Sequence, residues 1–202
     1  KYSTLAHSQG ALLVAYVEPI SLGMITPPGD YGADIVASES QALGVPLTFG
    51  GPYAGIFACK ERYIRQMPGR IVGKTIDSKN HTAYVLTLQT REQHIRRERA
   101  TSNICTSVAL IALMSTVYMA ANGKRGMKHI AELCYHKAHY AASIIEKIPG
   151  YSLPIKGTFF QEFVIQCPKD PSQINQQLLD YNIIGGLDIS HEIPNGMLIC
   201  VT

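Results

Sequence analysis

Residues 102–123 contain no charged side chain, and this stretch constrains the fold more than any other feature of the sequence. About 20 apolar residues in a helix are enough to cross a bilayer. Polar residues such as Ser102, Asn103 and Ser115 interrupt this stretch, however, so we predict a helix buried in a protein core. The glycine at Gly123 is typical of a helix C-terminus. Because no face of the helix carries charge, we expect every face to need cover.

The part of the chain before this helix predicts an α/β arrangement. A near-continuous apolar run such as that at residues 10–17 is typical of a buried parallel strand. The predicted elements, in chain order, are strands at 10–17, 33–37, 47–49 and 53–59, a short surface helix at 60–66, and a single strand at 84–88 within an otherwise loop-like 70–103.

The part of the chain after the helix predicts a small α+β domain. A second helix over residues 124–148 is ended by Pro149–Gly150. It is followed by a strand at 159–167, a helix at 171–181, a glycine turn at 185–186 and a strand at 197–201. Strands and helices of this length can pack as two layers, a small sheet with helices against one face. We therefore expect an α/β domain over 1–123 and a smaller α+β domain over 124–202.

Composition and charge exclude several classes of protein. The chain has 202 residues, of which 46% are apolar and 16% are charged, and this balance excludes wholesale disorder. A net charge of +3 does not by itself call for nucleic acid. The five cysteines are widely spaced without a C-x-x-C pair, which is typical of reduced thiols in a cytoplasmic protein. No spacing of His, Cys, Asp and Glu predicts a metal site.

The two ends of the sequence suggest a piece of a longer protein. The chain begins at Lys1 without Met or a signal-peptide pattern, and residues 198–202 resemble the interior of a strand. We expect additional polypeptide to supply part of any functional site.

The densest charge lies at residues 90–99, where four arginines and one histidine stand beside two glutamates. Arginine presents planar donors that suit carboxylates and phosphates, and a helix N-terminus such as the one predicted next stabilises an anion. The candidates for binding an anion or a neighbouring subunit are Arg91, His94, Arg96, Arg97, Thr101, Ser102 and Asn103. The same pattern is also typical of a solvated face with internal Arg–Glu pairs and an ordinary helix cap, and the sequence leaves these alternatives open.

A second candidate is the loop formed by Gly50, Gly51, Pro52 and Tyr53, which lies between two predicted strands. Glycines allow the backbone to approach a ligand closely. The loop matches neither the dinucleotide-binding fingerprint nor a phosphate-binding P-loop. A purely structural turn is the simpler explanation of this motif.

The stretch VLTLQTREQHIRRERATSNICT at residues 85–106 closely resembles the glycine cleavage system P-protein family, the decarboxylating glycine dehydrogenases. The resemblance runs almost from end to end. It includes PISLG at 19–23, PPGDYGADIV at 27–36, LTFGGPY at 47–53, MPGRIVG at 67–73, FFQEFV at 159–164 and IIGGL at 183–187. The details are most similar to the C-terminal half of subunit 1 in the two-subunit bacterial form.

The resemblance implies a type I fold of pyridoxal-phosphate (PLP) enzymes, with the end of the large domain over 1–123 and the small domain after it. It implies the family reaction, in which glycine is decarboxylated on PLP and the aminomethyl group passes to the lipoyl arm of the H-protein. The implied partners are glycine dehydrogenase subunit 2 in a heterotetramer, lipoylated H-protein and glycine, in the cytoplasm, without a membrane or nucleic acid.

The sequence departs from the family pattern at one position. The PLP-binding copy in this family carries its Schiff-base lysine five residues before the proline of the glycine-rich loop, and counting back from Pro46 gives Gln41. A carboxamide is not nucleophilic, so we expect the PLP lysine to lie in subunit 2 and this chain to support that site. Lys60 and Lys74 lie in the wrong segments to replace it.

Two other functions fit the sequence less well. A stand-alone aminotransferase that uses PLP would need a lysine in place of Gln41. A nucleic-acid-binding module built on residues 91–99 would need aromatic or lysine-rich interleaving, which this segment lacks.

Overall fold

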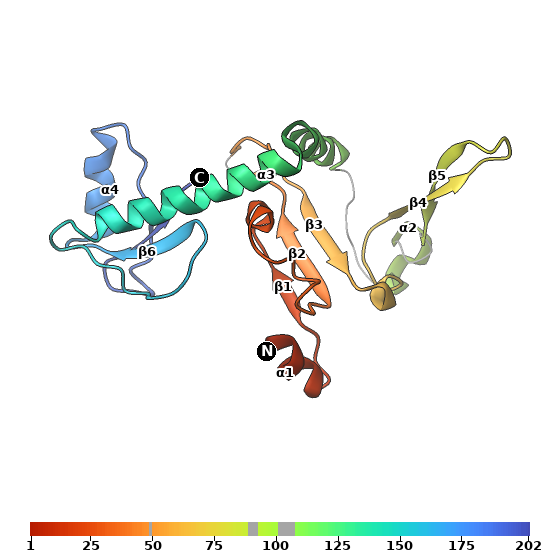
Figure 1. The fold of residues 1–202 in the computed structure, drawn as a ribbon, viewed down its shortest axis with the longest axis horizontal. Helices are drawn as coiled ribbons and strands as arrows, with labels where there is room; N and C mark the ends of the chain where they lie inside the picture. Colours follow the sequence, from red (N-terminus) through yellow and green to blue (C-terminus); the bar gives the residue numbers. More distant parts are fainter. Residues whose placement is uncertain (49, 89–92, 101–107) are drawn as a thin grey trace. The chain divides into compact units, whose positions relative to one another are not determined.

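The computed structural model describes residues 1–48, 50–88, 93–100 and 108–202, and the chain divides into two units (Figure 1). The first unit comprises Lys1–Pro19 and Ile25–Ala121, and the second comprises Ile20–Met24 and Asn122–Thr202. No helix among the described residues combines the length and the hydropathy needed to cross a membrane. The four cysteines that the structure describes form no disulfide.

The first unit begins with helix α1 (Tyr2–Ser8) and contains a three-stranded sheet in the order β1-β2-β3. Strand β1 (Val14–Tyr16) runs parallel to β2 (Ile35–Glu39), and β3 (Gly55–Cys59) runs antiparallel to β2. The predicted strands at 10–17, 33–37 and 53–59 are therefore confirmed, although each is shorter or shifted. The strand predicted at 47–49 is wrong for residues 47 and 48, which lie in a loop, and residue 49 lies outside the described residues.

Strand β1 is parallel, as predicted, but it is not buried. Val14 is 58% exposed and Tyr16 is 74% exposed. Val14 and Tyr16 lie on the same face of the sheet, and the described residues leave that face uncovered. The apolar composition of β1 is that of a strand covered on both faces.

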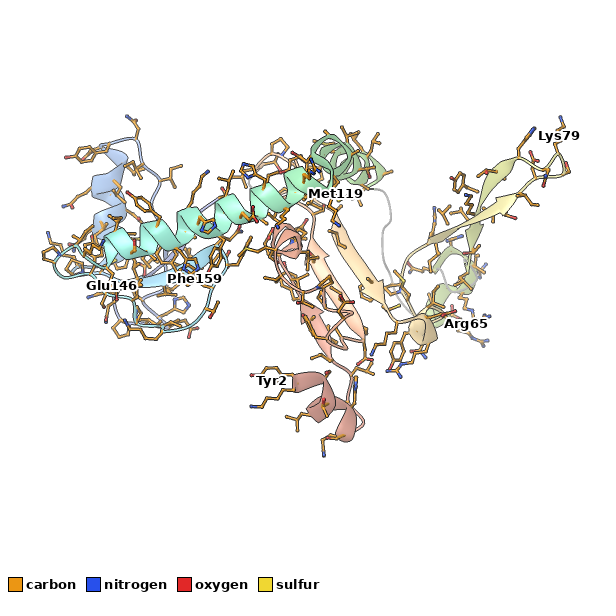
Figure 2. All side chains as sticks on the ribbon, viewed as in Figure 1. Tyr2, Arg65, Lys79, Met119, Glu146 and Phe159 are labelled. Carbon is orange, nitrogen blue, oxygen red and sulfur yellow. The ribbon has the colours of Figure 1, made fainter. Side chains whose placement is uncertain are left out.

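A β-hairpin follows the sheet and corrects the prediction of a loop with one strand. Strand β4 (Ile71–Ile76) pairs antiparallel with β5 (Thr82–Thr87). Gly73 and Lys74 interrupt the apolar residues of β4, and the sequence pattern missed the strand for this reason. Asp77 closes the turn, because its Oδ1 accepts hydrogen bonds from the amides of Lys79 and His81, each at 2.8 Å. Lys79 marks the tip of the hairpin in Figure 2.

Helix α3 (Ala109–Ile145) continues from the first unit into the second, and it is interrupted at Gly123. Gly123 has φ of 59° and ψ of −177°, so from residue 109 onward the two predicted helices are confirmed as segments that meet at this glycine. Residues 102–107 of the first predicted helix lie outside the described residues. The second segment ends at residue 145 rather than 148. The surface helix predicted at 60–66 is a short 3₁₀ helix, η2 (Glu61–Tyr63).

The first segment of α3 is buried on one face only, which corrects the prediction of a core helix. Ile111 and Ser115 are buried, and Tyr118 lies so close to Gly44 that a Cβ added at residue 44 would come within 2.7 Å of it. Leu110, by contrast, is 70% exposed, and Leu113 and Val117 are both more than half exposed. The described residues cover a single face of this uncharged helix.

The second unit is the small α+β arrangement that the sequence predicts. Its sheet has the order β6-β8-β7, with all neighbours antiparallel. The elements are β6 (Glu162–Gln166), α4 (Pro171–Leu179), β7 (Leu187–Asp188) and β8 (Gly196–Cys200). The core joins Ala138 and Ala142 of α3 to Phe163, Ile165 and Met197 of the sheet. The spacing of the two alanines places them on one helix face.

Candidate functional site

Gln41, which the sequence resemblance matches to the PLP lysine of the family, belongs to a tight turn after β2. Its Nε2 donates a hydrogen bond to the carbonyl of Val45 at 2.8 Å, and its own carbonyl accepts from the amide of Val45 at 3.1 Å. Leu43 and Val45 of the same turn are buried. The Gln41 side chain therefore ties its own turn together. These residues do not fit a covalent bond to PLP, because no amine stands at this position.

Two polar atoms at the end of β2 lack partners within the described chain. They are Oε1 of Glu39 and Oγ of Ser40, and Ser40 is only 3% exposed. Buried polar atoms are nearly always hydrogen-bonded in native structures. Hydrogen-bonding capacity thus remains open beside Gln41, at the carboxyl end of a strand.

The glycine loop is held by contacts with Thr48. The Thr48 amide donates to the hydroxyl of Tyr53 at 3.3 Å, and the Thr48 hydroxyl donates to the carbonyl of Gly51 at 2.8 Å. The Thr48 bonds, the amide above all, lower the pKa of Tyr53. Tyr53 also packs against the buried cluster of Val45 and Ile111. These contacts favour the structural explanation of the loop, in which Gly50 and Pro52 shape the turn.

The basic segment is exposed wherever the structure describes it. His94 and Arg96 lie in the short helix α2 (Gln93–Arg96), and Arg97 begins the 3₁₀ helix η4 (Arg97–Arg99). All residues from 93 to 99 are exposed, and within the described chain Glu98 forms no ion pair with the arginines. The other candidates, Arg91, Thr101, Ser102 and Asn103, lie outside the described residues. The structure therefore leaves the proposed anion or interface role of this segment untested.

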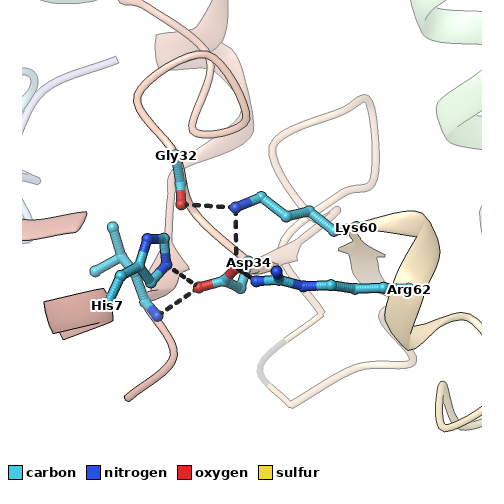
Figure 3. Close-up of polar contacts among 6 residues, drawn as sticks. His7, Gly32, Asp34, Lys60 and Arg62 are labelled. Carbon is cyan, nitrogen blue, oxygen red and sulfur yellow. Dashed lines mark hydrogen bonds and ion pairs between the residues drawn. The ribbon is translucent and has the colours of Figure 1, made fainter. Parts of the chain in front are cut away.

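The structure shows one polar network that the sequence analysis missed. Asp34 is 1% exposed, and four groups donate to its carboxylate. Oδ2 accepts from His7 Nε2 at 2.6 Å and from the Leu13 amide at 2.9 Å. Oδ1 accepts from Lys60 Nζ at 2.9 Å and from an Arg62 guanidinium nitrogen at 2.7 Å. Figure 3 shows His7 on one side of the carboxylate and the two cations on the other.

This network joins four separate segments of the first unit. It links α1, the residue before β1, the residue before β2, and the residues that follow β3. Lys60 Nζ also donates to the carbonyl of Gly32 at 3.2 Å. Lys60 is thus not the plain surface residue that the sequence indicated. The one sequence signal was the acidic residue at position 34 next to an apolar strand, where a carboxylate needs partners.

The bond from His7, followed by the bonds from Lys60 and the Leu13 amide, holds the pKa of Asp34 well below its usual range. Hydrogen bonds and nearby cations favour the charged form of a carboxyl group. The folded first unit therefore stabilises the ionised form of the Asp34 carboxylate.

We expect the protein to lose stability as the pH falls below about 5. Unfolded Asp34 takes up its proton near pH 3.8, whereas the folded carboxylate resists protonation to a lower pH. The stabilisation is complete above the unfolded pKa and is lost as the pH falls toward the folded pKa. Urea midpoints measured from about pH 7 to pH 3 check this, with Asp34→Asn expected to show a shallower decline. Equal slopes in both proteins would contradict the assignment.

The chain as a whole has the type I fold of PLP-dependent enzymes. An alanine–glyoxylate aminotransferase from Nostoc sp. matches 98% of the chain and 50% of its own, with a TM-score of 0.58 at 20% identity, a likeness that shows the fold alone. The chain belongs to the glycine cleavage system P-protein family, whose sequence profile matches residues 1–202. The resemblance found in the sequence and the predicted fold class are both confirmed.

Two other comparisons agree with this family. The crystal structure of glycine decarboxylase (P-protein) of the glycine cleavage system, in inhibitor-bound form, matches with a TM-score of 0.95 at 40% identity, covering 100% of this chain and 46% of that one. A Desulforamulus reducens protein named probable glycine dehydrogenase (decarboxylating) subunit 1 is 52% identical over 205 residues, covering 100% of this chain and 46% of the relative. The chain spans about half the length of the curated relative.

Proposed function

We propose that this chain is part of one subunit of a glycine decarboxylase. The assembled enzyme decarboxylates glycine and transfers the aminomethyl group to the lipoyl group of H-protein. The support is the family match across the whole chain, together with the subunit 1 name of a relative at 52% identity. The chain spans about half of that relative, so we assign the activity to the assembled enzyme and not to this chain alone.

This subunit lacks the lysine that carries PLP and supports the cofactor site of subunit 2. The observation that carries this proposal is Gln41, whose carboxamide is hydrogen-bonded to the carbonyl of Val45 where the family places its lysine. A residue engaged in closing its own turn is suited to a structural role. PLP is then held covalently by the partner subunit and not by this chain.

The basic segment is the part of this chain that meets the partner. In the described residues it presents His94, Arg96 and Arg97 to solvent, and a planar guanidinium suits the carboxylates or phosphate of a neighbouring site. Arg91, Thr101, Ser102 and Asn103 belong to the same proposed interface. The enzyme is a cytoplasmic heterotetramer with subunit 2, and lipoylated H-protein is its further partner.

The boundary between the large and small domains lies near residue 123 in this proposal, giving domains over 1–123 and 124–202. The break of α3 at Gly123 supports this position. The division of the chain between Ala121 and Asn122 supports it as well.

Reconstitution tests the proposed function. The protein at its full natural length is combined with the cognate subunit 2, PLP and lipoylated H-protein, and glycine-dependent CO2 exchange is measured. We expect exchange only when both subunits are present. Borohydride reduction, digestion and peptide mapping should then place a stoichiometric pyridoxyl-lysine in subunit 2, because this chain has Gln41 at the matching position.

The control is this chain mixed with PLP in the absence of subunit 2, where reduction should give scattered and substoichiometric surface labelling. A single stoichiometric pyridoxyl-lysine in this chain would show that it carries the cofactor. Exchange activity without subunit 2 would overturn the two-subunit proposal.

A further inference from the structure

The turn after β2 is closed by hydrogen bonds among residues 40–45, and we call it the closed turn. The amide of Leu43 donates to the carbonyl of Ser40 at 2.9 Å, and the amide of Val45 donates to the carbonyl of Gln41 at 3.1 Å. The Gln41 side chain adds a bond in the opposite direction, because its Nε2 donates to the carbonyl of Val45 at 2.8 Å. Residues 41 and 45 are therefore joined twice, and one of the two bonds depends on the side chain of Gln41.

The closed turn is also fixed to the elements on both sides of it. The Ser40 amide donates to the carbonyl of Ala54, just before β3, at 2.9 Å. On the other side, Gly44 has φ of 83°, and its backbone lies so close to the Tyr118 ring of α3 that no Cβ would fit between them. Val45 packs with Ala54 in one buried cluster. The closed turn thus belongs to the packing between the sheet and α3, and it cannot open without disturbing both.

An amine introduced at position 41 would meet the same acceptor. A lysine side chain is slightly longer than that of glutamine and ends in an ammonium, which the carbonyl of Val45 can accept from as it does from Gln41 Nε2. That hydrogen bond stabilises the charged form, and an ammonium has no lone pair with which to attack an aldehyde. A lysine turned away toward a cofactor would instead deprive the carbonyl of the buried Val45 of this donor. Both arrangements oppose a covalent bond to PLP.

We infer that the closed turn itself keeps this chain from binding PLP covalently, so that Gln41→Lys alone does not create a cofactor site. The proposed function requires only that the amine is missing, and the inference goes beyond it. The inference rests on that function, because the function brings PLP to the enzyme. Gln41 is then a positioning residue that holds the turn against Tyr118. In a site that lacked only its amine, Gln41→Lys would restore the covalent bond.

Peptide mapping of Gln41→Lys tests whether the turn excludes PLP. The full-length variant is assembled with the cognate subunit 2 and PLP, reduced with borohydride and digested. We expect a stoichiometric pyridoxyl-lysine in subunit 2 and at least about tenfold less label at residue 41. Stoichiometric label at residue 41 would overturn the inference and leave the proposed function standing, because the wild-type chain has Gln41 there. Stoichiometric label in the wild-type chain, or none in subunit 2, would overturn the proposed function and the inference with it.

Hydrogen exchange of the full-length protein tests the role of Gln41 without PLP. Gln41→Met keeps the length of the side chain and removes its donor, whereas Gln41→Lys keeps a donor. We expect the amides of Leu43 and Val45 to exchange about fivefold faster in Gln41→Met, the effect of one lost hydrogen bond. In Gln41→Lys they should stay within about twofold of the wild type.

Gln66→Met is the matched control, because Gln66 is an exposed glutamine in the same unit. It should leave exchange in the closed turn unchanged. Wild-type exchange of the Leu43 and Val45 amides in Gln41→Met would overturn the inference, because the Gln41 side chain would then not hold the turn.

Discussion

Replacing Asp34 with alanine is expected to lower the melting temperature of the protein by on the order of 10 °C. The substitution leaves the donors of His7, Lys60 and Arg62 without their common acceptor, and it leaves the Leu13 amide unsatisfied as well. The side chains of His7, Lys60 and Arg62 are 38%, 37% and 58% exposed and can turn to water, so the loss comes from the unsatisfied Leu13 amide and from the broken links between the four segments that Asp34 joins. Differential scanning calorimetry or thermal circular dichroism measures the shift.

Asp30→Ala is the matched control, because Asp30 is an exposed aspartate four residues earlier in the same loop region. Its melting temperature should lie within about 2 °C of the wild type, as for most surface substitutions. Lys60→Met should give an intermediate loss, since it removes one donor and leaves the other three. An Asp34→Ala protein that melts with the wild type would show that the network contributes nothing to stability.

Arg96→Ala and His94→Ala are each expected to lower the activity of the reconstituted enzyme at least about tenfold, a change of roughly 1.4 kcal/mol. A solvated arginine contributes about 0–1 kcal/mol, whereas a hydrogen bond to a charged partner contributes about 1.5–3 kcal/mol. The two roles therefore differ by a measurable amount. Glycine-dependent CO2 exchange gives the activity, and circular dichroism confirms that the fold is intact.

Lys124→Ala is the control for this pair, because Lys124 is exposed and lies in the second unit. It should leave activity and assembly unchanged. Full activity and normal subunit assembly in alanine variants of Arg91, His94, Arg96 and Arg97, each made singly, would establish that the segment is a solvated face.

Local sequence patterns predicted the helices and strands whose bounds depend on residues close in the sequence. The apolar run before Glu18 gave a parallel strand, Gly123 gave a break in the long helix, and the Asp170–Pro171 pair begins α4 with the Asp170 side chain accepting from the Ser172 amide at 2.8 Å. Strand β4 was missed because Gly73 and Lys74 break its pattern. These cases follow from the short range of capping and alternation.

Features that depend on distant segments were beyond the sequence. Asp34 is bound by His7, 27 residues earlier, and by Arg62, 28 residues later, and neither spacing carries a motif. Burial was equally out of reach, since the uncharged composition of residues 108–123 gave no indication that the face bearing Tyr118 would pack against Gly44. Gln41 was located by resemblance to a family, whereas the basic segment was located by its charge density, and the role of that segment stays a prediction.

The network around Asp34 also determines when the first unit can fold during its synthesis. A growing chain brings His7 and Asp34 out of the ribosome before Lys60 and Arg62. During that interval Oδ1 of Asp34 has neither of its two donors, Lys60 and Arg62, so the carboxylate is more stable in water than in the protein interior. Burial of the residues before β2 therefore waits until residues 60–62 have also left the ribosome.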